Sequence, residues 1–457
     1  MVKIADFIGV SAVENVTKAI EAAEKSYEYH AGLSLTRDRA LERAAKVDSG
    51  EISGRLAGVP FVAKDNFLTL GGTTTAASRF LEQFEAPLQA TAIERLEAEG
   101  AICIGKTNLD AFAHGGSTEN SAFGPTKNAH DQTRVAGGSS GGSAVATALG
   151  IVPFALGTDT GGSIRQPASF NGVVGVKPTY GTVSRYGVVA MASSTDTIGC
   201  FATNAADAEL VMSILSGRDE RDMTTLPDFF APQQDAVQPH KIGVIKEFMT
   251  DDVDEAVRQN VTDYIERMKA AGHIVEEVSL PLLKYALAIY YIVVPAEISS
   301  NLARYDGVRY GKRAETSDLQ ELYGKSRDDG FMPENKRRIM IGSYVLSSGF
   351  FDAYYLQAQK ARTLLINEFN KLFETYDALV GPVAPTPAFK LGENTEDPVK
   401  MYLADVMTVP ASLAGLPALS VPAGMTSEGL PVGVQLIGKR RDDALLLALA
   451  KSLEEDE

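Results

Sequence analysis

The chain has 457 residues, of which 45% are hydrophobic and 22% charged, a balance typical of a globular protein with a sizeable core. Its net charge of −16 argues against nucleic-acid binding by this chain alone, because phosphate contacts need clustered Lys and Arg. Cys103 and Cys200 are too few for a disulfide framework or a metal cluster, so we expect a reducing, cytoplasmic compartment.

Charged residues interrupt the sequence near its first residue. Asp6 and Glu14 break any apolar run there, so we expect no signal peptide. No organellar targeting segment stands out, and an organellar location is the alternative to the cytoplasm. No stretch approaches about 18 uncharged apolar residues, so we expect no membrane span.

Helical periodicity and short apolar runs alternate along the chain. The predicted helices are 11–25, 36–48, 91–99, 143–150, 253–271, most of 284–376, and 442–455. The predicted strands are 58–64, 101–108, 152–159, 241–247, 273–280, 377–383, 418–424 and 432–438. Residues 115–142, rich in Gly, Ser, Thr and Asn, indicate a long ordered loop or a site. This alternation predicts an α/β fold with a mixed sheet.

The domain organisation follows from what the sequence lacks. It has no internal repeat and no Pro-rich or charged linker, which favours one domain over 1–457. Within it we expect helices over 1–50 and an inserted helical layer over about 284–376.

Two Gly/Ser clusters stand out, GGSSGGS at 137–143 and DTGGSIR at 159–165. Glycine lets the backbone approach a ligand closely, so several N–H groups can meet one anion, either a phosphate or a developing oxyanion. A plain flexible loop is the alternative. The sequence contains no GxxxxGK[ST], and no GxGxxG follows a strand, which argues against a nucleotide site.

The run GSSGG also satisfies the esterase pattern GxSxG, with Ser140 at the elbow. That pattern needs a histidine late in the chain, and none follows His273. A serine nucleophile without histidine can use a neutral, buried lysine as its base. Lys64 and Lys106 both follow apolar runs, and Lys64 could instead be a surface lysine paired with Asp65. Local reasoning does not choose between the two lysines.

Three longer segments resemble the amidase signature family: GGSSGGSA, GTDTGGSIRQPASFNGVVGVKPTYG and LAGVPFVAKDN. The similarity extends over about 51–445. It implies an α/β fold whose large mixed β-sheet is covered by helices on both faces, with a helical insertion. It also implies a Ser–cisSer–Lys triad with Ser163 as nucleophile, Ser139 as bridging residue and Lys64 as base. The implied oxyanion hole is formed by the backbone N–H groups of Thr160, Gly161, Gly162 and Ser163.

Three further segments resemble one branch of the family, the glutamine-hydrolysing A subunits of tRNA-dependent amidotransferases: NLARYDGVRYG, RRIMIGSYVLSSGFFDAYYLQAQKAR and MYLADVMTVPASLAGLPALSVP. This implies that the chain releases ammonia for conversion of Glu-tRNA(Gln), Asp-tRNA(Asn) or both. It also implies a cytoplasmic hetero-oligomer with B and C subunits and no membrane contact. The chain would hold no cofactor and no metal, because ATP and Mg²⁺ are used, and tRNA is mainly bound, by the B subunit.

Free glutamine is a zwitterion, so its pocket needs a cation and an anion beside the triad. By the resemblance, Arg338 holds the α-carboxylate, with its neighbour Arg337 as the alternative. Asp405 holds the α-amine, and Tyr290 or the adjacent Tyr291 lines the pocket.

The stretch NLDAFAHGGSTENS departs from the family pattern NLDEFAMGSSTENS. Ala111 replaces an acid, His114 a methionine and Gly116 a serine. We expect Gly116 and Ser117 to lie near the pocket, where such changes would affect amide-donor preference or a partner contact.

Two other functions are consistent with parts of the sequence. A stand-alone amidase for an aryl or fatty acid amide would have an apolar tunnel in place of the Arg338 and Asp405 pair. A catalytically silent scaffold would lack triad residues, and all three triad positions are filled here.

Overall fold

The computed structural model describes residues 1–227, 230–232, 239–395 and 397–454. In these residues eleven strands lie side by side in a single sheet. The sequence predicts that the sheet is mixed, and it predicts eight of the eleven strands. Their spatial order is β1 (Gly32–Leu35), β3 (Ile102–Thr107), β2 (Pro60–Lys64), β4 (Phe154–Asp159), β6 (Thr197–Ala202), β5 (Val174–Lys177), β10 (Ala418–Met425), β11 (Pro431–Gly438), β9 (Ala378–Pro382), β7 (Lys241–Ile245) and β8 (Ile274–Val278). Pairing is antiparallel from β4 to β9 and parallel in β3–β2–β4 and β9–β7–β8.

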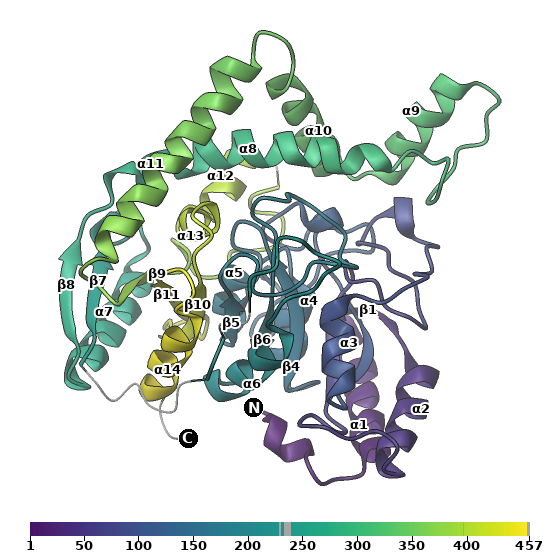
Figure 1. Ribbon diagram of the computed structural model, residues 1–457, viewed down its shortest axis with the longest axis horizontal. Coiled ribbons are helices and arrows are strands. Elements are labelled where there is room, and N and C mark those ends of the chain that lie inside the picture. Colours follow the sequence, from purple (N-terminus) through teal and green to yellow (C-terminus); the bar gives the residue numbers. More distant parts are fainter. Residues whose placement is uncertain (228–229, 233–238, 396, 455–457) are drawn as a thin grey trace.

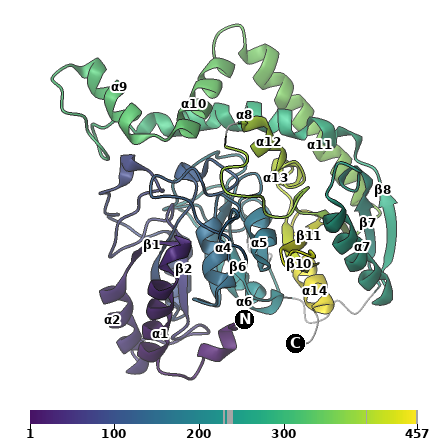
Figure 2. The same cartoon turned by 180° about the vertical axis from the view of Figure 1, so that it is seen from behind.

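Helices cover both faces of this sheet. The helices are α1 (Ala12–Lys25), α2 (Arg37–Asp48), α3 (Thr91–Ala98), α4 (Gly141–Ala148), α5 (Arg165–Asn171), α6 (Ala205–Leu215), α7 (Glu255–Ala270), α8 (Ala286–Asn301), α9 (Leu319–Gly330), α10 (Pro333–Val345), α11 (Gln357–Leu372), α12 (Pro398–Leu403), α13 (Val409–Leu413) and α14 (Asp443–Leu453). α1, α2, α4 and α5 pack on one face, seen in Figure 2, and α3, α6 and α14 pack on the other.

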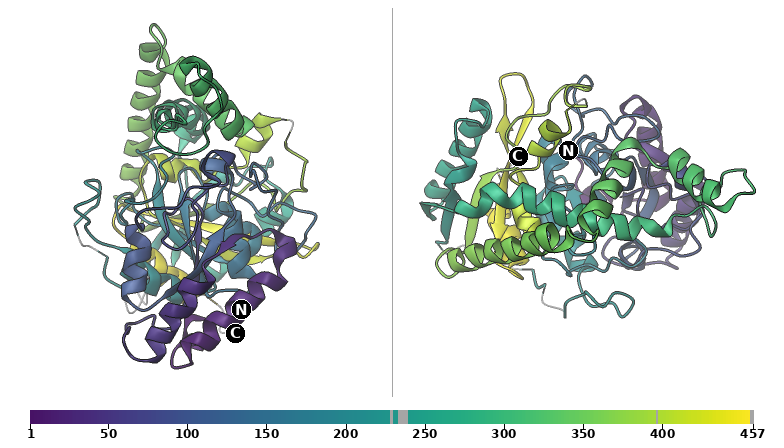
Figure 3. Two further views of the ribbon diagram at one scale, coloured as in Figure 1. Left: turned by 90° about the vertical axis from the view of Figure 1, so that its right-hand side faces the viewer. Right: turned by 90° about the horizontal axis from the view of Figure 1, so that it is seen from above.

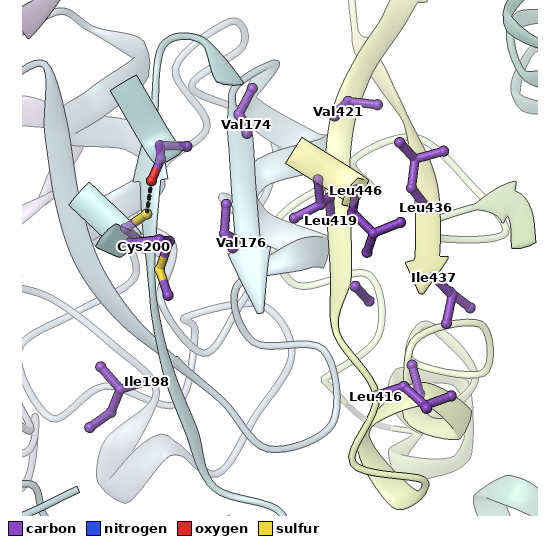
Figure 4. Close-up of a cluster of buried hydrophobic side chains, with 14 of the residues drawn as sticks. Val174, Val176, Ile198, Cys200, Leu416, Leu419, Val421, Leu436, Ile437 and Leu446 are labelled. Carbon is purple, nitrogen blue, oxygen red and sulfur yellow. Dashed lines mark hydrogen bonds between the residues drawn. The ribbon is translucent and has the colours of Figure 1, made fainter. Parts of the chain in front are cut away.

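The strand sequences explain these two layers. Successive side chains alternate between the faces, so Phe61 joins one apolar cluster and Val62 the other. Ile102 and Cys103 divide in the same way. Because both faces are covered, the strands read as continuous apolar runs. Figure 4 shows the larger cluster where side chains of β5, β6, β10 and β11 meet α14, including Leu446.

The helices α8, α9, α10 and α11 lie together at one end of the molecule, the green segment at the top of Figure 1. Figure 3 shows this layer from the side and from above, with the N-terminus at the opposite end. The layer occupies the region 284–376 that the sequence assigns to a helical insertion. The division into domains stays a prediction, and its last residues, 455–457, lie outside the described residues, as does the end of the predicted helix 442–455.

The segment Pro281–Arg304, which contains α8, is long and apolar enough to cross a membrane, with a mean hydropathy of 1.4. Lys284 and Glu297 interrupt its apolar run, so it contains no stretch of about 18 uncharged apolar residues. Half of this segment's apolar window is buried inside the protein, where α8 packs against α10, α11 and α13. This packing accounts for its apolar composition.

Some elements were not predicted. The sequence pattern indicates neither β1, β5 and β6 nor α6, and α4 begins at Gly141, inside a region predicted to be loop. β1 and β5 have only four residues each, and the sequence of β6 contains glycine and cysteine within its apolar run. Such short or mixed runs give little periodic signal.

The topology places the strand ends that matter for chemistry at one edge. β2, β3 and β4 are parallel neighbours, so their carboxyl ends lie at the same end of the sheet. Their last residues are Lys64, Thr107 and Asp159. Loops that follow the carboxyl ends of parallel strands are where ligands bind in α/β sheets.

Candidate active site

Lys64, the last residue of β2, points its amine at Ser139. The Nζ–Oγ distance is 2.8 Å, and Nζ lies 2.9 Å from Thr158 Oγ1. Lys64 and Ser139 are fully buried, and the peptide bond between Gly138 and Ser139 is cis. The structure therefore brings together the predicted base and the predicted bridging serine.

The environment favours a neutral amine on Lys64. Burial lowers the pKa of Lys64 to about 7, although the nearby carboxylates of Asp110, Asp159 and Asp196 favour the charged form. Burial also raises the pKa of Asp110 to about 6. The backbone N–H groups of Thr118 and other loop residues donate to its carboxylate and act in the opposite direction, lowering the pKa. A neutral Lys64 has a lone pair that can accept a proton from Ser139.

Ser163 lies on the turn between β4 and α5. It is 8% exposed, and its carbonyl accepts a hydrogen bond from the Ser140 N–H at 3.2 Å, which ties the two Gly/Ser loops together. Ser163 is thus the member of the predicted triad that a ligand can reach.

A buried ion pair holds this turn. Asp159 precedes the turn and Arg165 follows it, and their side chains pair at 2.8 Å. Arg165 also donates to Gln435 Oε1 at 2.6 Å, on β11, and to the carbonyl of Thr408 at 2.8 Å. The turn is therefore fixed at both ends and to the opposite half of the sheet.

The backbone N–H groups of Thr160, Gly161, Gly162 and Ser163 donate to no acceptor in the described part of the chain. Close neighbours hold them in place. A Cβ on Gly161 would come 2.7 Å from the hydroxyl of Tyr290, and a Cβ on Gly162 would overlap Thr408 Oγ1. These positions need glycine, and their unpaired donors suit a developing oxyanion.

The alternative serine and lysine have other roles. Ser140 is buried, and its hydroxyl donates to the Thr158 carbonyl at 3.2 Å. Lys106 pairs with Asp65 at 2.6 Å and donates to the Phe67 carbonyl at 2.7 Å. Asp65 is therefore the partner of Lys106 rather than of Lys64.

Arg338 rather than Arg337 points into the protein. Arg338 is 4% exposed, whereas the side chain of Arg337 is 44% exposed and pairs with Glu334 at the surface. Nε of Arg338 donates to Glu334 at 2.8 Å, and its guanidinium lies 5.4 Å from the ring centre of Tyr291. The ring of Tyr291 in turn stacks on the ring of Tyr402, with 3.9 Å between the ring centres.

Asp405 follows Tyr402 by one turn and lies beside the 159–165 cluster and the loop at Gly116. A Cβ on Gly162 would come 3.4 Å from its carboxylate, and a Cβ on Gly116 3.6 Å. Burial raises the pKa of Asp405 to about 7, while the charge of Arg338 acts in the opposite direction. The predicted cation and anion thus share one region next to Ser163.

Tyr290 and Ser117 also lie at this site. The ring of Tyr290 lies against Gly161, while Tyr291 belongs to the aromatic pair beneath Arg338. Ser117 is buried, and its backbone lies directly against Gly138, next to the cis peptide.

Sequence reasoning missed several polar residues here. Thr158 bonds to Lys64 and also accepts from Asn66 Nδ2 at 3.1 Å. Gln166 Oε1 accepts from the Gly138 N–H at 2.9 Å. Their position next to the Lys64 and Ser163 motifs was the available signal. Among the described residues, no group of three or more His, Cys, Asp and Glu side chains is placed to hold a metal ion.

The chain is similar to known proteins over nearly its whole length. The amidase family pattern matches residues 11–447. The chain is 51% identical over 450 residues to the A subunit of the glutamyl-tRNA(Gln) amidotransferase of Koribacter versatilis, covering 96% of this chain and 93% of the relative. It is 52% identical to the protein of the same name from Latilactobacillus sakei, covering 95% of this chain and 90% of that relative. The crystal structure of the A subunit of the Thermotoga maritima glutamyl-tRNA(Gln) amidotransferase matches with a TM-score of 0.83 and 40% identity, covering 99% of this chain and 94% of that one.

Proposed function

Since the chain belongs to the amidase family, we propose that it hydrolyses glutamine as the A subunit of a glutamyl-tRNA(Gln) amidotransferase. The observation that carries this proposal is the pairing of a Ser–Ser–Lys arrangement with one buried arginine and one carboxylate. An amide donor that is also an amino acid needs those charges, and a simple amide does not.

The proposed reaction is acyl transfer through Ser163. Neutral Lys64 accepts the Ser139 proton while Ser139 Oγ accepts the proton of Ser163. Ser163 Oγ then attacks the side-chain carboxamide carbon of glutamine. The carbonyl oxygen becomes an oxyanion, which the free N–H groups on the 160–163 turn stabilise.

Collapse of this intermediate breaks the C–N bond. The proton returns from Lys64 through Ser139 to the leaving nitrogen, which departs as ammonia and leaves an ester between Ser163 and the glutamyl group. Water, deprotonated by the same relay, attacks that ester and releases glutamate. Each cycle returns Lys64 to its neutral form.

The charged residues fix the orientation of glutamine. Arg338 would take the α-carboxylate with the two Nη groups that Glu334 leaves free, and Asp405 would take the α-ammonium. Tyr290 would close the pocket over Gly161. The bond to be broken would then lie over Ser163.

The proposal includes partner subunits. We place tRNA binding and the use of ATP and Mg²⁺ in a B subunit, with a C subunit in the complex, and the complex in the cytoplasm. The net charge of −16 supports this division, because this chain would repel the tRNA phosphates.

Co-purification with candidate B and C subunits, followed by a glutaminase assay with and without Glu-tRNA, tests the proposal. We expect a stable complex that hydrolyses glutamine and transfers the ammonia to Glu-tRNA. Robust hydrolysis of aryl or fatty acid amides by the isolated chain, without glutaminase activity in the complex, would show a stand-alone amidase instead.

A further inference from the structure

His114 is a buried histidine whose hydrogen-bonding pattern can be read from its neighbours. It is fully buried, on the loop that precedes Gly116, and its Nδ1 lies 2.8 Å from Nδ2 of Asn335 on α10. The two residues are 221 positions apart in the sequence. This contact joins the loop after β3 to the helix that carries Arg338.

The orientation of the Asn335 amide is fixed by two backbone groups. The Met332 N–H can only donate, and it lies 3.1 Å from Oδ1 of Asn335. The Ala111 carbonyl can only accept, and it lies 2.7 Å from Nδ2. Nδ2 is therefore the amino group, and its second hydrogen points at Nδ1 of His114.

It follows that Nδ1 of His114 is an acceptor and carries no hydrogen. In a neutral imidazole the hydrogen is then on Nε2. Burial and the neighbouring charge of Arg338 lower the pKa of His114 well below its ordinary value, so the ring stays neutral. Nε2 is buried and has no hydrogen-bond partner among the described residues. A buried donor without an acceptor is rare in folded proteins and needs an explanation, and an acceptor atom of a ligand is one such explanation.

The surroundings of Nε2 point to an anionic ligand. Asn335 and Arg338 are three residues apart on α10 and so share one face of the helix, which places the imidazole next to the guanidinium. Nη1 and Nη2 of Arg338 also make no hydrogen bond within the described residues. Gly116, two residues after His114, lies next to the carboxylate of Asp405. The loop that carries His114 therefore passes Asp405, and the charge of Arg338 acts on both residues.

A carboxylate matches this set of donors. Its two oxygens accept about four hydrogen bonds, of which a guanidinium takes two in the bidentate arrangement. We propose that Nε2–H of His114 is a further donor to the α-carboxylate of the amide substrate, beside Arg338, and that His114 strengthens the preference of this chain for amino-acid amides. This inference rests on the proposed function and names a specificity-determining residue for it.

Two substitutions separate the two ring nitrogens. His114→Asn places an amide oxygen near the position of Nδ1, so the contact with Asn335 is kept and the donor to the substrate is lost. His114→Gln places an amide N–H near the position of Nε2, so the donor is kept and the contact with Asn335 is lost. Each variant is the control for the other.

The experiment measures kcat and KM of the assembled complex for glutamine and for 4-aminobutanamide, which lacks the α-carboxylate. We expect His114→Asn to raise KM for glutamine roughly 10- to 100-fold with little change in kcat. For 4-aminobutanamide its kcat/KM should equal that of the wild type. His114→Gln should have a KM for glutamine at least several-fold below that of His114→Asn, and thermal melting shows whether both variants fold.

An unchanged KM for glutamine in His114→Asn would overturn the proposal. So would an equal loss for both substrates, or a larger loss in His114→Gln, because these results indicate a packing role. A wild-type complex that does not hydrolyse glutamine would remove the proposed function itself, and with it this inference.

Discussion

Lys64 and Lys106 are buried on adjacent parallel strands, β2 and β3, but their amines have different partners. Lys106 lies 2.6 Å from the carboxylate of Asp65, whereas Lys64 lies 2.8 Å from the hydroxyl of Ser139. The buried ion pair occupies the amine of Lys106, whereas burial lowers the pKa of Lys64, whose amine lies beside hydroxyl groups and can lose its proton. This difference assigns a structural role to one lysine and a chemical role to the other.

Replacing each lysine by methionine tests that assignment. Lys64→Met should abolish glutaminase activity, with a loss of at least about 100-fold, and leave the free energy of unfolding unchanged or higher. Lys106→Met should lower the free energy of unfolding by about 3–5 kcal/mol, because it leaves Asp65 buried and unpaired. Denaturant unfolding and the glutaminase assay on both variants measure this. A stable but inactive Lys106→Met protein would reverse the assignment.

The pH dependence of kcat/KM should report the ionisation of two groups, Lys64 and Asp405. Lys64 and Asp405 both have pKa values of about 7, raised by burial for Asp405 and lowered by burial for Lys64. The base must be neutral and the carboxylate ionised, so each requirement is met above its pKa and activity rises with pH through about 7. Well below that pH the slope of log kcat/KM should approach about 2.

Asp405→Asn removes one of these two titrations. The slope should fall to about 1 in this variant, while the pH dependence of kcat, which reports Lys64 in the bound state, is kept. An unchanged slope would mean that Asp405 is already ionised across this range and does not limit binding.

Glycine at position 162 is required by close packing. A Cβ there overlaps Thr408, so Gly162→Ala should displace the turn and its N–H donors and lower kcat by roughly 100- to 1000-fold. Gly324→Ala, on α9 with no atom within 4 Å of the added carbon, is the matched control and should keep wild-type kinetics. Equal kinetics for the two variants would contradict the role of the turn.

The two neighbouring arginines provide another matched pair. Arg338→Gln should raise KM for glutamine about 10- to 150-fold, because a hydrogen-bonded charge pair with the α-carboxylate is lost. Arg337→Gln should change KM little, since that side chain is exposed and pairs at the surface. The kinetics of both variants with glutamine decide the choice, and the opposite ranking would assign the carboxylate to Arg337.

The sequence predicts the site better than its surroundings. Lys64, Ser139 and Ser163 lie in motifs whose glycines and apolar flanks are local signals, and the structure brings the motifs together. The contact of His114 with Asn335 has no such signal, because it depends on how a helix far along the chain packs over a loop. The choice between Arg337 and Arg338 is equally invisible in sequence, since only the rotation of α10 decides which side chain is buried.

The sheet shows the same division. β2, β3 and β4 are apolar runs that end in polar residues, and both features are local. β6 pairs with β4 and β5 along its length, so its order comes from neighbours distant in sequence. This pairing with β4 and β5 makes β6, which contains Cys200, a strand although its sequence has only a weak propensity for one.

The central claim, that Ser163 releases ammonia from glutamine for a partner protein, is tested most directly with the complex of Ser163→Ala and its B and C subunits. Transamidation of Glu-tRNA is measured with glutamine and, separately, with ammonium salt. We predict that glutamine-dependent activity falls by at least about 1000-fold while ammonia-dependent activity is kept. Loss of both activities in a complex that still assembles, or glutamine-dependent activity that persists, would contradict the account.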